Sequence, residues 1–275
     1  MEYNKENGQF IKKYSFDKSK IVKDSYFKYW LLGLLASDGN INNNTFSITQ
    51  SKKCGKDLIY YIKDQLNYNG VVYENDTASG NKSYSLTISS KDIVSYLSKY
   101  NIIKNKTYNF ILPDIDSEEY FNYFIRGYFE GDGSVGIYDN GNGIEYIQSS
   151  IYGQKNVIEQ IGEFINADGN VNEKKKGFAE IRYNGAEAVA FFNQIYSNAE
   201  NDGIFVGKKY NIFKKYINTD FKNTVYYDSQ MRKEKIQKLL NEGFTPYHIA
   251  KYKNVNTNFQ TIYGWINKGE LFYDK

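Results

Sequence analysis

Hydrophobic and polar residues along the chain follow two spacings, and the order of these spacings repeats. Apolar residues three or four positions apart predict amphipathic helices, and strict alternation predicts half-buried strands. The first part of the chain is expected to contain a helix over 26–36, a hairpin turning at 42–44, a helix through Leu58 to Leu66, strands over 71–74 and 84–88, and a helix through Ile93 to Tyr100.

The same order returns in the second part of the chain. It is expected to contain a hairpin turning at 140–143, a helix through Val157 to Ile165, strands around 173–177 and a last helix over 186–196. We therefore expect an α+β fold with a first half over 1–107 and a second half over 108–217. A polar linker over 218–228 then leads to a separate helical module over 229–275.

The strongest feature is a repeated motif at the end of the first helix of each half. The segments Trp30–Gly39 and Phe124–Gly133 align without a gap, so that Gly33 matches Gly127, Asp38 matches Asp132 and Gly39 matches Gly133. An internal repeat of this kind indicates two copies of one structural unit.

The motif has a physical interpretation of its own. Glycine inside a helix costs about 1 kcal/mol relative to alanine, so its repetition indicates that the two helices pack too closely for a side chain. An aspartate at a helix C-terminus faces the negative end of the helix dipole, and two such carboxylates would repel each other. This arrangement suits divalent cations, which bind carboxylates, carbonyl oxygens and water, and paired metal sites support phosphodiester displacement.

A simple turn is the alternative interpretation of each Asp-Gly pair. Asp168-Gly169 and Asp202-Gly203 also occur in the chain, and we interpret both as ordinary turns. Asp38 and Asp132 differ because each lies five residues after a helix glycine and follows a matching apolar run.

Both segments resemble the signature motif of the LAGLIDADG homing endonucleases, in the form with two motifs in one chain. The resemblance implies two pseudo-symmetric αββαββα halves that pack through the motif helices and present saddle-shaped antiparallel sheets. It implies cleavage of both strands of a long double-stranded DNA site, across the minor groove and with short 3′ overhangs. It further implies Mg²⁺ or Mn²⁺ as cofactor, with Asp38 and Asp132 as catalytic metal ligands and the backbone carbonyls of Ser37 and Gly131 as additional ligands.

The resemblance also implies polar residues near the reacting phosphate. Gln50 lies where the family often has a polar residue that orders water near the reacting phosphate. Lys91 lies where the family often has a positively charged residue that stabilises phosphoryl charge. A cation near developing charge is a common device in phosphoryl transfer, although Lys91 is also one solvated lysine among many.

The second half departs from this pattern. Gly153 aligns with Gln50, with Gln154 one place further along, and no lysine aligns with Lys91, although Arg182 lies nearby. Where the family usually has an acid before the aspartate, the first motif has Ala36 and the second has Glu130. The two sites are therefore expected to cut their strands at unequal rates.

The polar face of the predicted strands is the expected DNA surface, because a twisted sheet can enter a major groove and contact base edges. The candidates share a polar side chain on or beside a strand: Asn40, Asn42, Asn44, Ser47, Thr49, Tyr73, Asn75, Lys82, Tyr84, Tyr138, Asn140, Gln148, Ser150, Lys174, Lys176 and Arg182.

Composition is compatible with DNA binding but does not indicate it. Lys+Arg 35 against Asp+Glu 32 gives a net charge of +3, far from the basicity typical of many nucleic-acid-binding domains. Arg126, Arg182 and Arg232 are the only arginines. Lysine serves phosphate contacts better than bidentate recognition of guanine, so base recognition is expected to depend mainly on amide, hydroxyl and tyrosine side chains.

One cysteine, Cys54, excludes an intramolecular disulfide and a cysteine-based zinc cluster. Since no apolar run approaches the ~18 residues of a membrane span and residues 1–25 lack a signal-peptide core, secretion is not expected. We expect a protein of the cytoplasm of a bacterial or phage-infected cell, or of an organellar matrix. It lacks the terminal residues of an intein, so it is expected to be freestanding or intron-encoded, and two halves in one chain predict a monomer.

The last module resembles the helix-turn-helix of resolvases and small regulators. Thr245-Pro246 predicts a helix start, and the third helix is the one expected to contact DNA, through Thr257, Asn258, Gln260, Thr261 and Tyr263. A small helical bundle for protein contacts is the alternative. His248, the only histidine, has no neighbouring metal ligands in sequence.

Three functions fit these observations. A metal-dependent DNA endonuclease agrees with both aspartates. A non-catalytic transcription regulator would combine a LAGLIDADG core with a helix-turn-helix, but such proteins typically lack the acids. An RNA maturase that assists splicing of a host intron, and so has intron RNA as a partner, is compatible with endonuclease activity.

Overall fold

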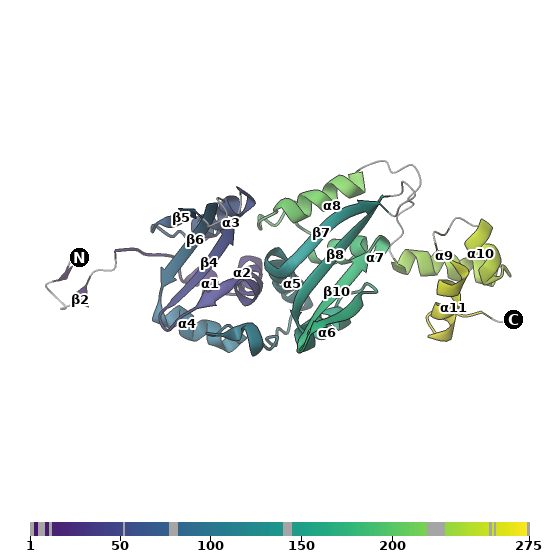
Figure 1. Ribbon diagram of the computed structural model, residues 1–275, viewed down its shortest axis with the longest axis horizontal. Helices are drawn as coiled ribbons and strands as arrows, with labels where there is room; N and C mark the ends of the chain where they lie inside the picture. The colour runs from purple at the N-terminus through teal and green to yellow at the C-terminus, as the bar shows by residue number, and fades with distance from the viewer. Residues whose placement is uncertain are drawn as a thin grey trace.

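The structure, a computed structural model, describes residues 3–4, 9–10, 13–51, 53–76, 82–139, 145–218, 229–252, 255 and 257–273. The predicted hairpin turn at 140–143, with Asn140, and almost all of the predicted linker over 218–228 lie outside these residues. The described chain forms two neighbouring α+β halves with a small helical module at one end (Figure 1).

The first half follows a short N-terminal segment with β1 (Tyr3–Asn4), β2 (Gln9–Phe10) and α1 (Ser19–Val22). Its elements, in order, are α2 (Tyr26–Ser37), β3 (Gly39–Ile41), β4 (Thr45–Ser51), α3 (Lys53–Gln65), β5 (Val72–Asp76), β6 (Lys82–Ser89) and α4 (Lys91–Leu97), followed by the 3₁₀ turns η1 (Ser98–Tyr100) and η2 (Lys106–Tyr108).

The second half repeats this order. Its elements are α5 (Glu118–Asp132), β7 (Gly133–Asp139), β8 (Glu145–Gln154), α6 (Lys155–Phe164), β9 (Asn170–Lys175), β10 (Phe178–Asn184) and α7 (Ala186–Ile195), followed by α8 (Lys208–Asn218). The strand orders β3-β4-β6-β5 and β7-β8-β10-β9 correspond, and the strand pairs within both sheets are antiparallel. The predicted αββαββα arrangement of both halves is therefore confirmed.

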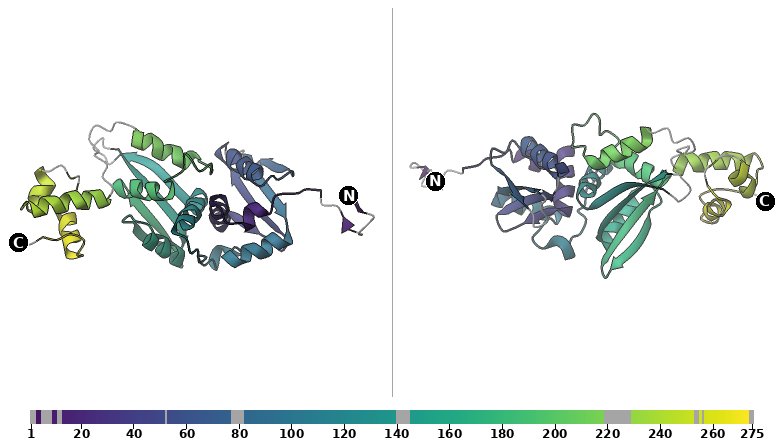
Figure 2. Two further views of the ribbon diagram at one scale, coloured as in Figure 1. Left: turned by 180° about the vertical axis from the view of Figure 1, so that it is seen from behind. Right: turned by 45° about the horizontal axis from the view of Figure 1, so that its top comes forward.

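Alternation along the strands determines which face of each sheet is buried. In β4, Phe46 and Ile48 are buried, and Ser47 between them lies on the opposite face. The buried faces pack against helices in one continuous core, so the other face of each sheet is left open. Figure 2 shows the sheets and their covering helices from two further directions.

Helices α2 and α5 join the halves along the two glycines of the repeated motif. A Cβ atom on Gly33 would lie 1.9 Å from the backbone oxygen of Phe124, and one on Gly127 would lie 1.9 Å from the backbone oxygen of Trp30. Backbone therefore rests on backbone at both positions, as the sequence predicted. This contact brings the C-terminal ends of the two helices together.

A buried ion pair fixes the segment that leads into α8. Arg126 on α5 binds the Asp202 carboxylate at 2.7 Å, and it donates to the carbonyl oxygens of Ile204 and Phe205, each at 3.0 Å. Asp202-Gly203 is thus more than an ordinary turn, because the Asp202 side chain is buried against α5. Removing one partner of such a pair would leave an uncompensated buried charge.

The C-terminal module has its own small core. It consists of α9 (Ser229–Asn241), α10 (Pro246–Tyr252) and α11 (Phe259–Asn267), which pack around Ile236, Ile249, Ile262 and Trp265. Three helices agree with the expected number, and the similarity to a helix-turn-helix remains a prediction. Among the described residues, no helix is both long and apolar enough to cross a membrane.

The helix contact predicts a large difference between two glycine substitutions. Gly127→Ala should destabilise the core by more than about 3 kcal/mol, because the new methyl group meets backbone that cannot rotate away. Gly264→Ala in α11 is the matched control, since its Cβ would enter open space, and it should stabilise its helix by up to about 1 kcal/mol. Urea denaturation followed by circular dichroism measures both effects, and equal stabilities would contradict the close contact.

Candidate active site

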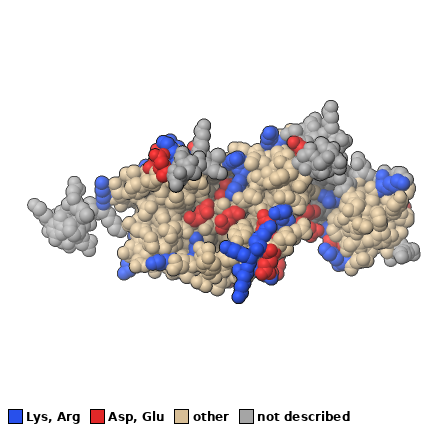
Figure 3. Space-filling view, in the orientation of Figure 1, with Lys and Arg blue, Asp and Glu red and all other residues tan. Residues whose placement is uncertain are grey.

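The two motif aspartates lie side by side where α2 and α5 end. Asp38 is the residue that caps α2, and Asp132 is the last residue of α5. A Cβ atom on Gly131 would lie 2.1 Å from Ser37 Oγ and 3.1 Å from Asp38 Cγ, so the ends of the two motifs are in direct contact. Acidic side chains gather at the centre of the molecule, between the two halves (Figure 3).

Two lysines that the sequence analysis did not select hold these helix ends. Lys106 Nζ donates to the carbonyl oxygens of Gly39 at 2.6 Å and Ser37 at 3.3 Å. Lys209 Nζ donates to the carbonyl oxygens of Phe129 and Glu130, each at 2.6 Å, and to that of Gly131 at 3.5 Å. A cation at a helix C-terminus is favourable because the last carbonyls lack partners within the helix.

The lysines occupy equivalent places in the two halves. Lys106 begins η2 after the last helix of the first half, and Lys209 is the second residue of α8 after the last helix of the second half. Each comes from a segment distant in sequence, so no local spacing connects it to its carboxylate.

The electrostatics of the site are dominated by lost hydration and by the two carboxylates. Burial between the halves, with the charge of Asp38, raises the pKa of Asp132 to about 6, while Lys106 and Lys209 act in the opposite direction. Burial lowers the pKa of both lysines, and the nearby carboxylates oppose this change. Acid and base therefore lie close enough to influence each other across the junction of the halves.

Gln50 lies at the first of the two carboxylates, as predicted. Its Nε2 atom donates a hydrogen bond to Asp38 Oδ2. Gly39 pairs with Ile48 in the first sheet and Gly133 with Ile151 in the second, so counting two residues onward places Gly153 opposite Gln50. The alignment made from sequence is therefore also the structural one.

The second site lacks a glutamine at the corresponding place. Gln154 turns away from Asp132 and donates to the carbonyl oxygens of Lys106 at 3.2 Å and Thr107 at 3.0 Å, so it supports the segment that carries Lys106. Glu130 accepts a hydrogen bond from Tyr196 Oη at 2.6 Å. Lost hydration raises the pKa of Glu130, against the effect of Lys209.

Lys91 lies at a different part of the first half. It begins α4 and lines a cavity together with Asn42 and Asn43 at the hairpin turn, at the far end of β3 from Asp38. The lysine that the structure brings to the carboxylates is Lys106 instead. The role considered for Lys91 therefore fits Lys106, and Arg182 lies on the sheet rather than beside Asp132.

The open face of the first sheet carries small uncharged side chains. Paired positions on this face are Asn40 with Ser47, Thr49 with Ser85, and Ser85 with Tyr73. Asn42 and Asn44 are exposed at the hairpin turn, and Asn75 continues the row on β5. The predicted DNA-contacting residues that share this accessible surface are therefore Asn40, Asn42, Asn44, Ser47, Thr49, Tyr73 and Asn75.

Two predicted residues of this half face the other way. Tyr84 lies on the helix side of β6 in line with Leu86 and Ile88, and only 7% of it is exposed. Lys82 has the same parity and pairs with Glu74 at 3.1 Å. Their assignment to the open face was wrong, because residues two apart in a strand share a face.

The open face of the second sheet is more strongly charged. Ser134 pairs with Ser150, and Gln148 and Tyr138 follow on the same face. Glu180 binds both Lys174 and Arg182 at 2.8 Å. Lys176 is exposed in the turn before β10. The two halves therefore present different chemistry to a ligand lying across them.

In the C-terminal module, part of the predicted DNA-contacting set has a structural role. The Asn258 side chain accepts hydrogen bonds from Thr261 N at 2.8 Å and Thr261 Oγ1 at 3.1 Å, which caps the start of α11. Gln260 and Tyr263 are exposed, and Thr257 is half-buried.

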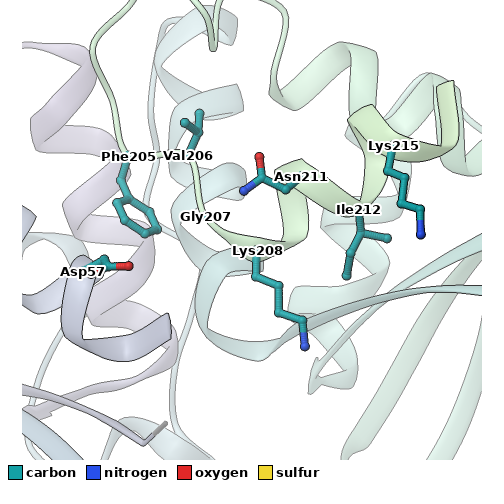
Figure 4. A pocket seen from close by; sticks show the side chains of 8 residues that line it. All are labelled: Asp57, Phe205, Val206, Gly207, Lys208, Asn211, Ile212 and Lys215. Atoms are coloured by element: carbon teal, nitrogen blue, oxygen red, sulfur yellow. The ribbon is translucent and has the colours of Figure 1, made fainter. Parts of the chain in front are cut away.

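A hollow of about 460 Å³ opens between α3 of the first half and α8 of the second. Asp57 lies on one side, and Lys208, Asn211 and Lys215 lie along one face of α8 on the other (Figure 4). This face begins next to Lys209, so it extends positive charge outward from the carboxylates.

The class of the fold follows from these features. Residues 119–196 match the family model for a LAGLIDADG-like domain, and they include all of α5 but its first residue, both strand pairs and α7. This part of the chain is similar to a LAGLIDADG-like domain, and the first half repeats its topology. The resemblance seen in the sequence is therefore confirmed for the matched residues.

Solved structures with a similar fold include several meganucleases. I-SmaMI bound to uncleavable DNA aligns at a TM-score of 0.47 with 12% identity, covering 77% of this chain and 97% of its own. I-AabMI bound to uncleaved DNA gives 0.47 and 14%, covering 74% and 96%. The I-LtrWI homing endonuclease bound to target DNA gives 0.45 and 14%, covering 90% and 99%. No curated protein matches the sequence.

The raised pKa of Asp132 predicts how stability depends on pH without metal. Between pH 3.8 and about 6 the Asp132 carboxyl of the folded protein retains a proton that the unfolded chain has released, so the contribution of Asp132 to stability falls as the pH rises through this range. Asp132→Asn should remove this dependence and be more stable than the wild type at pH 7. Urea denaturation in EDTA at several pH values tests this.

Asp114→Asn is the control for this measurement, because Asp114 is exposed and lies away from the junction. It should keep the pH dependence of the wild type. The same pH dependence in Asp132→Asn as in the wild type would contradict the arrangement of charges.

Proposed function

We propose that this protein is a site-specific endonuclease that hydrolyses both strands of a long double-stranded DNA target with the help of divalent metal ions. The single observation that carries this proposal is the contact between the two motif ends, which places Asp38 and Asp132 side by side with a lysine at each. Two carboxylates at like-charged helix ends are unfavourable for stability alone, so a cationic ligand accounts for their placement.

The donor set fits Mg²⁺ or Mn²⁺. Mg²⁺ typically binds one or two carboxylates and takes its remaining ligands from water and substrate phosphates, and the junction offers Asp38, Asp132 and the carbonyls of Ser37 and Gly131. These carbonyls are the most distant acceptors of Lys106 and Lys209, at 3.3 and 3.5 Å, which leaves them free to take a further partner. A bound metal ion supplies Lewis acidity to the phosphate and lowers the pKa of a water molecule.

The chain's own groups perform the remaining tasks. Gln50, anchored on Asp38, can orient an attacking water on one strand. Lys106 and Lys209 place positive charge where negative charge develops on the reacting phosphates, and their anchoring to backbone fixes that charge before reaction. Both lysines belong to the protein framework, so they need little reorganisation.

Target recognition is proposed to use the open faces of the two sheets. The first sheet offers hydroxyl and amide groups, and the second adds Arg182, whose fork of donors suits guanine in the major groove. The C-terminal module would contact flanking DNA through Gln260 and Tyr263 of α11. A single chain supplies both halves, so a monomer is sufficient for one site.

Substitution of the aspartates tests the proposed activity. Purified protein is incubated with Mg²⁺ and DNA of a candidate host genome, intact and intron-free, and the new ends are sequenced. The wild type should give discrete double-strand breaks at one site. Asp38→Asn and Asp132→Asn should each reduce double-strand cleavage at least about 100-fold, because each removes a carboxylate of the shared site.

Asp114→Asn should cleave like the wild type and serves as the matched control. Sequence-specific binding without breaks, unchanged by the aspartate substitutions, would contradict the nuclease and favour a transcription regulator. Tight binding of intron RNA without DNA breaks would favour a maturase.

Charge on α8 gives a second test, of DNA binding. Lys208→Ala combined with Lys215→Ala should weaken binding and reduce the slope of log K against log salt by up to about 1.8, because each phosphate contact contributes about 0.9. Lys20→Ala with Lys23→Ala is the control, since both lysines are exposed near the opposite end of α2 from Asp38. Fluorescence anisotropy measures this slope with an intact duplex that contains the cleavage site, with Ca²⁺ in place of Mg²⁺. Equal slopes for the α8 variant and the control variant would exclude this contact.

A further inference from the structure

The two halves differ at two equivalent places beside their aspartates, one on the motif helix and one on the following hairpin. Directly after the repeated glycine, α2 has Leu34 and α5 has Tyr128. On the following hairpin, Gln50 corresponds to Gly153 through the strand registers. The first half thus combines an apolar helix residue with an amide on the strand, and the second combines a hydroxyl on the helix with no side chain on the strand.

The Tyr128 hydroxyl occupies the place that a side chain at position 153 would need. A Cβ atom on Gly153 would lie 2.6 Å from Tyr128 Oη, and its next neighbour would be Ile158 Cδ1 at 3.3 Å. A glutamine at position 153 is therefore incompatible with Tyr128 as it stands. The Tyr128 hydroxyl can occupy this place only because Gly153 has no side chain.

The Tyr128 ring is held firmly in this position. Only 4% of the residue is exposed, and its ring stacks on Phe110 with centroids 6.4 Å apart and planes 25° apart. A ring packed on both α5 and the segment before it has few alternative rotamers, so its hydroxyl is fixed in space.

The hydroxyl is also electrostatically close to both carboxylates. Tyr128 lies one helical turn before Asp132 on α5, and residues four apart share a helix face. Burial raises the pKa of the Tyr128 hydroxyl, and the charges of Asp132 and Asp38 raise it further. At neutral pH the group is thus an uncharged phenol that can both donate and accept a hydrogen bond.

We infer that the Tyr128 hydroxyl takes, at the Asp132 site, the place that the Gln50 amide takes at the Asp38 site, and orients the attacking water or a phosphate oxygen there. This inference rests on the proposed endonuclease activity. The polar group that β8 lacks at Gly153 is then supplied by Tyr128 on α5.

The inference predicts that the two residues serve opposite strands. The test uses a duplex with the site found by genomic cleavage and a different label on each strand, and it measures nicking of each strand separately. Tyr128→Phe should slow one strand about 10- to 100-fold and leave the other at the wild-type rate. Gln50→Leu should slow the strand that Tyr128→Phe leaves unchanged.

A reciprocal exchange separates this role from simple packing. Tyr128→Leu should slow the same strand as Tyr128→Phe. Adding Gly153→Gln to Tyr128→Leu recreates the Leu34 and Gln50 pair of the first half and should restore that strand's cleavage, whereas a purely structural defect would not be restored by a new amide.

Several results would overturn the inference while leaving the endonuclease intact. These are wild-type rates on both strands in Tyr128→Phe, equal slowing of both strands, or slowing of the same strand by Tyr128→Phe and Gln50→Leu. Thermal denaturation of each variant shows whether it is folded. A wild-type protein that nicks neither strand contradicts the endonuclease itself, and the role of Tyr128 with it.

Discussion

Backbone contact between α2 and α5 is the constraint on which the rest of the structure depends. At Gly33 and Gly127 each helix rests directly on the other's main chain, and no residue with a side chain can take either place without moving the helices apart. This contact sets the distance between the halves and brings Asp38 to Asp132. The same approach puts two carboxylates and two negative helix ends together, so the structure needs compensating positive charge at this point.

Much of the fold could be predicted because its requirements are local. Close helix packing demands glycine, strands demand alternation, and both requirements recur in each half, so the repeat of Gly33 and Asp38 at Gly127 and Asp132 revealed two copies of one unit. Alignment of the two halves by sequence also placed Gly153 opposite Gln50, and the strand registers agree with it. Tyr84 could have been placed by the same rule, since it alternates with Leu86 and Ile88 as part of the buried set.

The positive charge at the site could not be predicted in this way. Lys106 lies 67 residues from Gly39, and Lys209 lies 80 residues from Phe129, whose carbonyl oxygens they bind. No spacing rule connects such distant positions, and in a chain rich in lysine neither residue stands out. Lys91 was predicted from the resemblance to the family, and the structure places it beside the hairpin turn of the first half instead. Tyr128 was hidden differently, because on an apolar interface helix a tyrosine is indistinguishable from core.

The paired lysines also affect the order in which the site can be assembled. Each helix end has its own cation, so the negative charge of the two carboxylates is partly compensated within the fold. Under the proposed function, an approaching duplex, itself a polyanion, therefore does not meet a bare negative cleft. Under the same proposed function, docking on DNA and loading of metal are then separable events, and the protein would be able to bind DNA before its metal site is filled. In a nuclease built in this way, Lys106 and Lys209 would keep the negative charge of the site partly neutralised until target DNA and metal are both bound.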